Sequence, residues 1–284
     1  MSASAPLIAR RPRTKWFWSV LPGYFGFTII SFWIVAALTA RFWIPYSPFD
    51  TVGSRLTPPS FDHLFGTDAL GRDVFSRTMA GALYSIPIAF VVVTIGAFIG
   101  CVLGAFAGFV GGWRSAVVMR LVDITLSFPP MLLAMAVAAS FGPGLTTAAA
   151  AMIIVWWPLY ARLMQAQVLS VIRMEHVEAA IASGVRPGRL LLRHILPLCW
   201  TPILVNATMD FGQVVLLAAS LSFIGLGAAP PAPEWGAMVS DGAVNYYFWW
   251  IAAAPGVAIL SVVLALNFIG DRVRDILDPR KHQS

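Results

Sequence analysis

Long runs without a charged side chain are the feature that most limits how this chain can fold. Five such windows cover residues 16–40, 78–113, 124–161, 211–233 and 242–270. Each is long enough to cross a bilayer, because its hydrocarbon layer takes about 20 apolar residues in a helix. Only 11% of the residues are charged and 58% are hydrophobic, whereas about a quarter of a soluble domain is charged. The sequence therefore predicts an all-α membrane protein.

Two of these windows do not correspond to one helix each. Residues 141–144, Phe-Gly-Pro-Gly, divide the window 124–161, because glycine and proline together favour a tight turn. The window 211–233 extends back through Asp210 to about Trp200, which gives a helix with one acidic residue inside it. We expect six transmembrane helices, at about residues 18–40, 84–107, 119–140, 146–165, 199–220 and 247–269.

Basic residues indicate which side of the membrane each loop faces. With the N-terminus inside, fifteen of the 19 lysines and arginines lie in or beside inner segments. This asymmetry satisfies the positive-inside rule, so both termini and the segment 166–198 are expected in the cytoplasm. The formal charge of +6 then reports orientation in the lipid bilayer rather than nucleic-acid binding. The expected regions are a tail, first helix and outer loop (1–80), a five-helix core (81–270) and a cytoplasmic tail (271–284).

The chain lacks the residue patterns of an enzyme or a metal protein. Lysine occurs only at Lys15 and Lys281, which excludes a phosphate-binding loop of the Gly-x-x-x-x-Gly-Lys-Ser/Thr type. Cys101 and Cys199 are isolated, and the four histidines are scattered without metal-ligand spacing. We expect no bound cofactor and no metal, and any ATP used must be hydrolysed by another subunit.

The longest polar segment between the hydrophobic spans runs from residue 173 to 197. It contains Glu178-Ala179-Ala180, then Gly184, then Pro187. Glycine fits the left-handed position that ends many helices, and proline is tolerated in the first turn of the next helix. The segment therefore predicts two short helices joined by a tight turn. From the residues alone, a solvated loop is favoured over a docking site for a cytoplasmic partner.

Four motifs, in order along the chain, carry a resemblance to a known family. Glu178-Ala179-Ala180-x-x-x-Gly184 followed by residues 194–197, His-Ile-Leu-Pro, resembles the EAA loop of ABC importer permeases. Residues 65–77, residues 221–227 with 233–236, and residues 270–280 are similar to the dipeptide, oligopeptide and nickel branch of that family. The resemblance implies a type I ABC importer permease bundle of six transmembrane helices with cytoplasmic coupling helices, in the inner membrane of a bacterium.

The same resemblance implies partners for this chain. They are a second homologous permease subunit, two ATP-binding subunits that hold ATP and Mg²⁺, and an extracytoplasmic solute-binding protein. The solute would be a dipeptide, an oligopeptide or nickel. Two positions depart from the family pattern, since His194 replaces a usual isoleucine and Ala218 stands where many relatives have an acid. The residues implied in ATPase coupling are Glu178, Ala179, Ala180, Gly184, His194, Leu196 and Pro197.

Two outer segments contain further candidate residues. Asp68, Arg72 and Asp73 lie in a short charged segment with Gly71 at a turn. Either these charges form a structural knot of salt bridges, which we favour, or they contact the binding protein or form a gate. Glu234 and Trp235 are candidates for the same contacts, and they follow a proline-rich segment that excludes a regular helix.

Asp210 is the candidate for the translocation path. A carboxylate near the middle of a bilayer costs several kcal/mol unless it is paired or hydrated. It could line the path, or it could hydrogen-bond Asn206 or a neighbouring subunit. A rival function is a secondary transporter or channel that uses Asp210 as an ion relay. Near the cytoplasm, Asp123 is expected to pair with Arg120. Pro129-Pro130 is a helix-kink site, which could line a cavity with freed carbonyls but is expected to shape helix packing.

Overall fold

The computed structural model describes residues 13–277, with side chains from residue 22 onward, and this part of the chain is helical without a named strand. The prediction of an all-α fold is confirmed. The helices are α1 (Arg13–Trp43), α2 (Val74–Val110), α3 (Gly112–Leu126), α4 (Pro130–Phe141), α5 (Leu145–Val171), α6 (Glu175–Ala182), α7 (Pro187–Leu190), η1 (Leu191–Ile195, one π-helical turn), α8 (Leu196–Phe223), α9 (Trp235–Val244) and α10 (Trp250–Leu277).

Five helical stretches among the described residues are long and apolar enough to cross a membrane singly. They are residues 22–43, 74–110, 145–171, 187–223 and 250–277. The span expected over 119–140 is not one straight helix, because α3 and α4 meet at an angle of 92°. Pro129 has ψ 129°, which is extended backbone, since a residue that precedes a proline is pushed out of the helical region. The bent pair makes the sixth span when it is counted as one.

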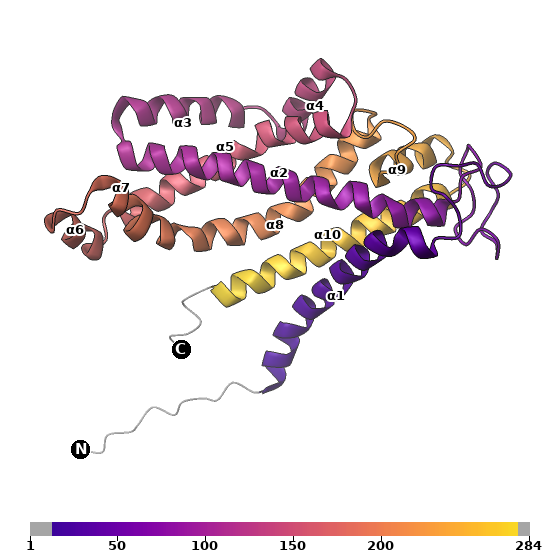
Figure 1. Cartoon of the computed structure of the whole chain (residues 1–284), viewed down its shortest axis with the longest axis horizontal. Helices are drawn as coiled ribbons and strands as arrows, with labels where there is room; N and C mark the ends of the chain where they lie inside the picture. Colours follow the sequence, from indigo (N-terminus) through magenta and orange to yellow (C-terminus); the bar gives the residue numbers. More distant parts are fainter. Residues whose placement is uncertain (1–12, 278–284) are drawn as a thin grey trace.

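The close contact between α2 and α5 forms the centre of the bundle (Figure 1). Gly96, Gly100, Gly104 and Gly108 face α5 at intervals of four residues. A Cβ atom at Gly100 or Gly104 would overlap a backbone carbonyl oxygen of α5. Small residues at this spacing let two membrane helices approach closely and gain van der Waals contact. The glycine series therefore fixes the position of α5 against α2.

The helix α3 is tied to α5 near the surface. The guanidinium of Arg162 forms an ion pair with Asp123. The expected pair between Asp123 and Arg120 is therefore wrong, because α5 brings Arg162 to the same place from a distant part of the sequence. Both partners are about half exposed, with side-chain exposures of 51% and 55%.

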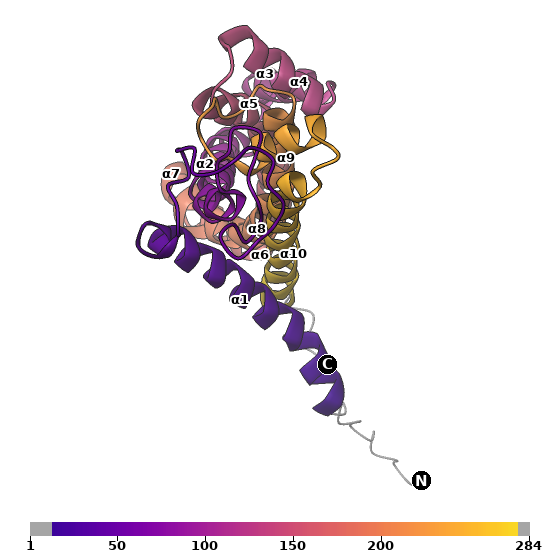
Figure 2. The same cartoon turned by 90° about the vertical axis from the view of Figure 1, so that its right-hand side faces the viewer.

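The helix α1 lies at the edge of the bundle, along α10 (Figures 1 and 2). The indole nitrogen of Trp33 donates a hydrogen bond to the Ser261 hydroxyl at 2.9 Å. The ring of Trp33 also packs edge-on against Trp235 of α9, with centroids 4.9 Å apart. These contacts hold α1 at its outer half.

The bundle has two different ends (Figure 1). One end contains α6 and α7, and the opposite end contains the long loop 44–73 together with α9. The starting end of α1 and the finishing end of α10 point toward α6 and α7. We call the end with loop 44–73 the outer end, following the orientation expected from the distribution of charges.

Candidate functional site

The polar segment at the end opposite the outer loop folds as a helix, a turn and a second helix, as its sequence predicts. We call residues 172–197 the docking element. Gly184 has φ +74°, the left-handed conformation that favours glycine. The amides of Gly184 and Val185 donate to the carbonyls of Ile181 and Ala180 at 2.9 and 3.2 Å. This double hydrogen bond closes α6 as a Schellman motif, and Pro187 then begins α7.

The second arm of the docking element is not a separate short helix, as the sequence predicts, but continues into a long helix. Pro197 lies in the first turn of α8, directly after a π-helical turn. The π-helical turn η1 joins α7 to α8, so residues 187–223 form one helical stretch. A displacement of α7 would therefore reach the outer end of α8 directly.

Burial divides the seven candidate coupling residues into three groups. Glu178, Ala179, Gly184 and Pro197 are exposed, whereas His194 and Leu196 are half-buried. Ala180 points inward with Val177, which is completely buried. One face of α6 thus packs on the protein and the opposite face is open to solvent. The open face also carries Ile181, with 52% of its surface exposed.

Asp210 is paired inside the bundle rather than open to a cavity. The hydroxyl of Tyr160 on α5 donates to its Oδ2 atom at 2.6 Å. Tyr160 is completely buried and Asp210 is only 4% exposed. The expected partner Asn206 is half-buried on the same helix, and the hydrogen bond that the structure gives this carboxylate comes instead from α5. Sequence reasoning missed Tyr160 because fifty positions separate the two residues in the chain.

The charged segment of the outer loop forms the predicted knot of salt bridges. The Nε atom of Arg72 donates to Asp68 at 2.6 Å, and the Nε atom of Arg77 lies 3.6 Å from the same carboxylate. The backbone amides of Leu70 and Arg72 also donate to Asp68, at 2.8 and 2.9 Å. Gly71 has φ +74° at the turn between these residues. A single buried carboxylate therefore orients two arginines.

Asp73 joins this loop to the start of α2. Its carboxylate accepts hydrogen bonds from the Ser76 amide at 2.8 Å and from the Ser76 hydroxyl at 2.7 Å, which caps the helix. The Nδ1 atom of His63 lies 3.0 Å from its other oxygen. Asp73 is completely buried, so its contacts are internal.

Glu234 and Trp235 connect α9 to α2. Glu234 caps α9 by accepting from the Ala237 amide at 2.9 Å, and the Ser85 hydroxyl donates to it at 3.2 Å. The indole nitrogen of Trp235 donates to the carbonyl of Thr78 at 2.8 Å. The sequence did not predict α9, which begins directly after the irregular proline-rich segment.

The five outer candidates share one property, which is burial of the side chain. Each is less than about a tenth exposed, so these side chains brace the outer end and do not form its surface. This geometry favours the structural interpretation of the knot over direct contact with a partner. The residues concerned are Asp68, Arg72, Asp73, Glu234 and Trp235.

Beside the knot lies a cavity of about 500 Å³ whose mostly apolar wall contains three charged side chains, and which we call the outer cavity. Arg72 and Arg77 line it together with Asp241 of α9. The Nη2 atom of Arg72 lies 3.8 Å from the Asp241 carboxylate. Burial raises the pKa of Asp241, while the two arginines act in the opposite direction. Sequence reasoning missed Asp241, although an acid in an outer segment otherwise poor in charge was a usable signal.

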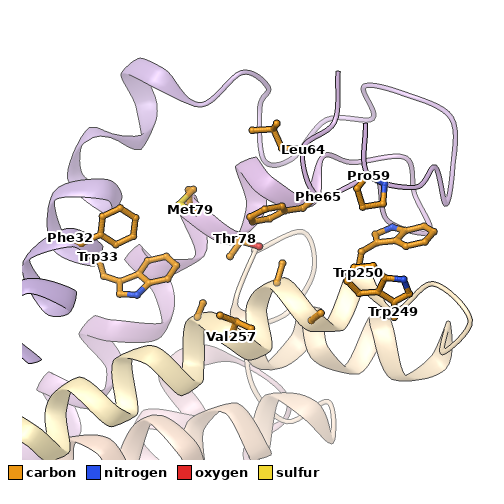
Figure 3. Close-up of a pocket in the computed structure, with 13 residues that line it drawn as sticks. Phe32, Trp33, Pro59, Leu64, Phe65, Thr78, Met79, Trp249, Trp250 and Val257 are labelled. Atoms are coloured by element: carbon orange, nitrogen blue, oxygen red, sulfur yellow. The ribbon is translucent and has the colours of Figure 1, made fainter. Parts of the chain in front are cut away.

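A second, apolar groove of about 460 Å³ opens between α1, α2, the outer loop and α10 (Figure 3). The indole nitrogen of Trp250 already donates a hydrogen bond to the Thr67 carbonyl at 3.2 Å, so it is not available to a solute. A groove of this composition offers no partner to a charged solute. Its lining includes Phe32, Trp33, Phe65, Met79, Trp250 and Val257.

Residues 100–283 match the family described as binding-protein-dependent transport system inner membrane component. This match covers more than half of the chain. The chain therefore belongs to that family and is a membrane-spanning permease component of an ABC importer, located in an inner membrane that it crosses several times.

Several curated relatives align over most of their own length. The chain is 46% identical to a probable D,D-dipeptide transport system permease protein of Escherichia coli, over 80% of this chain and 76% of the relative. It is 43% identical to a dipeptide transport system permease of Alkalihalophilus pseudofirmus, over 90% and 84%. It is 40% identical to a di/tripeptide transport system permease of Pseudomonas aeruginosa, over 98% and 96%.

Solved structures support the fold. A chain of the MetNI methionine ABC transporter, in inward-facing conformations, aligns with a TM-score of 0.59 and 22% identity. The alignment covers 71% of this chain and 96% of the MetNI chain. The predicted bundle of the importer permease type is therefore confirmed.

Proposed function

We propose that this chain is one of two permease subunits that form the path for short peptides in an ATP-driven importer. The observation that carries the proposal is the open face of α6, with Glu178 and Gly184 exposed, in a chain whose relatives are named dipeptide and di/tripeptide permeases. An exposed helix at the end of a membrane bundle provides a docking surface for another subunit. The second permease subunit would be a homologue of this chain.

In this proposal, ATP and Mg²⁺ are bound by two partner ATPases. Each ATPase receives a docking element from one permease subunit, and here the open face of α6 inserts into it. Movement of the ATPases then displaces α7 and, through η1, the whole stretch 187–223. A ligand shifts such an equilibrium only through different contacts in the two states. The contribution of this chain is therefore mechanical, and bond chemistry takes place in the partners.

The orientation of the chain in the membrane follows from the distribution of charge. Fifteen lysines and arginines on the side of the docking element and four on the other side support a cytoplasmic docking element and cytoplasmic termini. An extracytoplasmic solute-binding protein would then deliver its peptide to the end that carries loop 44–73 and α9.

The test uses the assembled transporter, expressed with its neighbouring permease, ATPase and binding-protein genes. Uptake of a labelled dipeptide and ATP hydrolysis are measured for Gly184→Ala and Glu178→Ala. We expect each to lower peptide-dependent ATP hydrolysis at least about tenfold, because Gly184→Ala adds left-handed strain of about 1–2 kcal/mol and Glu178→Ala removes a docking group. The bundle should still insert normally.

Each variant has a matched control. Gly188→Ala adds the same methyl group where space is open and φ is not left-handed, and Asp50→Ala removes an exposed carboxylate from the outer loop, away from the docking element. Both should retain near-normal transport. Normal coupling in Gly184→Ala and Glu178→Ala would overturn the docking proposal. Uptake of nickel but not peptide would overturn the proposed solute, and uptake without any ATPase would favour the ion-relay alternative.

A further inference from the structure

The outer cavity places both signs of charge on one wall. Arg72 and Arg77 are only 6% and 3% exposed, yet both line a cavity of about 500 Å³. Sites for small molecules have volumes of about 300–1,000 Å³ and a few fixed polar groups. The outer cavity therefore has the size and the kind of lining that a small solute requires.

The two arginines are held in place before any solute arrives. The Arg72 guanidinium is fixed by Asp68 at 2.6 Å. The Nη1 atom of Arg77 donates to the carbonyls of Pro48 and Pro231 at 2.8 and 3.4 Å. Groups that are already ordered lose little conformational entropy on binding. Positive charge is thus presented to the cavity in a fixed geometry.

The charged groups in the wall of the outer cavity are two arginines and one acid, Asp241, while Asp68 lies behind the arginines. Both guanidiniums lie against the single carboxylate of Asp68, and the next acid, Asp241, stands 3.8 Å from Arg72 with 54% of its side chain exposed. Asp241 is open to solvent in this longer pair, so its carboxylate can accept a further ion, whereas the side chain of Arg72 is 7% exposed and meets a ligand only through the cavity that it lines. A carboxylate fits beside the arginines and an ammonium group fits beside Asp241.

The walls of the outer cavity include residues of the helix that continues from the docking element. They include Ser222 at the outer end of α8, Pro143 in the turn between α4 and α5, and residues of α9. The helix α8 is the one that continues from the docking element. A displacement of α8 would change the shape of the outer cavity.

We propose that the outer cavity is a subsite for a solute in transit that carries both a carboxylate and an ammonium group, as a short peptide with free ends does. The carboxylate would lie against Arg72 and Arg77, and the ammonium group against Asp241. The apolar part of the wall, which includes Ala228, Ala229 and Val244, would accept different side chains. This inference rests on the proposed function, because it assigns a place to the peptide within the same importer.

The test combines a change in the protein with a change in the solute. Uptake of a labelled dipeptide and of its N-acetylated form is measured in the assembled transporter, for the wild type and for Asp241→Asn. Each solute is supplied at a concentration that saturates the binding protein, established separately with that protein alone. Comparing two proteins with two solutes isolates the contact between Asp241 and the ammonium group, since a purely structural effect would lower the uptake of both solutes equally.

We expect Asp241→Asn to lower the maximal uptake of the free dipeptide about five- to tenfold, and to leave uptake of the N-acetylated dipeptide within about twofold of the wild type. Asp241→Glu should recover most of the loss because it retains the charge. Asp62→Asn is the control, since it removes an exposed carboxylate from the same outer surface.

Two outcomes would overturn the subsite. One is an equal loss for both solutes, which would assign Asp241 to folding or to contact with the binding protein. The other is unchanged uptake of both solutes. In either case, peptide uptake that still depends on Gly184 would leave the proposed function intact. Absence of peptide uptake in the wild type would instead remove the proposed function itself.

Discussion

The two ends of the bundle treat their charged residues in opposite ways. At the outer end, Asp68, Asp73 and Arg77 are at most 4% exposed, and each has hydrogen-bonding or ionic partners inside the chain. At the opposite end, Glu178 and Arg186 are exposed on the docking element. The salt-bridge knot is already assembled, whereas the docking element presents its polar groups to water.

This difference has an energetic basis. Burying a charge is costly unless it is paired and hydrogen-bonded, and the outer end meets that condition with several bonds to each carboxylate. The docking element keeps its charges hydrated and so can exchange water for a partner. The outer end should therefore control stability and the cytoplasmic end should control coupling. Three substitutions test that division, in descending order of effect on stability.

Asp73→Ala should have the largest effect. It removes the cap of α2 and leaves His63 and Ser76 without their carboxylate partner. Loss of one partner from a buried network costs about 3–5 kcal/mol. The midpoint of thermal unfolding of the purified transporter, followed at one scan rate, should fall by many degrees. Asp73→Asn retains a capping oxygen and should lose less. A midpoint equal to that of Glu178→Ala would break the comparison between the ends.

Tyr160→Phe should have an intermediate effect. It removes the donor to Asp210 and leaves a buried carboxylate short of a hydrogen bond. Such a loss costs about 1–3 kcal/mol. Tyr24→Phe is the control, because Tyr24 is 67% exposed. If both variants unfold at the wild-type temperature, the hydrogen bond from Tyr160 does not stabilise the buried carboxylate of Asp210, and another group must do so.

Arg162→Ala should have the smallest effect. Its ion pair with Asp123 is half exposed, and exposed pairs contribute about 0–1 kcal/mol. The unfolding midpoint should stay within a degree or two of the wild type. Arg77→Ala removes the same side chain type from the buried knot and should cost much more. Equal losses for these two arginines would show that burial does not separate the two ends.

Local patterns in the sequence were sufficient for several elements. The charge-free windows located the membrane helices because a helix in lipid satisfies its own backbone hydrogen bonds. Gly184 and Pro187 predicted the turn and the second helix of the docking element because both act on their own backbone. The salt-bridge knot was predictable for the same reason, since Asp68 and Arg72 lie close together in the chain.

Other features depend on residues that are distant in sequence. Asp123 had a neighbour of opposite charge in Arg120, yet the fold brings Arg162 to it from α5. The bend at Pro129-Pro130 was visible as a disruption, but its angle of 92° depends on how α3 and α4 pack against other helices. The spacing of Gly96, Gly100, Gly104 and Gly108 was a readable signal for close helix packing that the sequence analysis did not use.

The sequence by itself determined the class of the molecule, namely a basic-inside bundle of apolar helices with a helix–turn–helix between two of its spans. These properties follow from composition and from conformational preferences of single residues. Only the tertiary structure decided that Asp210 pairs with Tyr160 and that Arg72, Arg77 and Asp241 meet at one cavity. The physical reason is that a buried charge must find its partner in space, and the packing of helices, not the order of residues, brings that partner near.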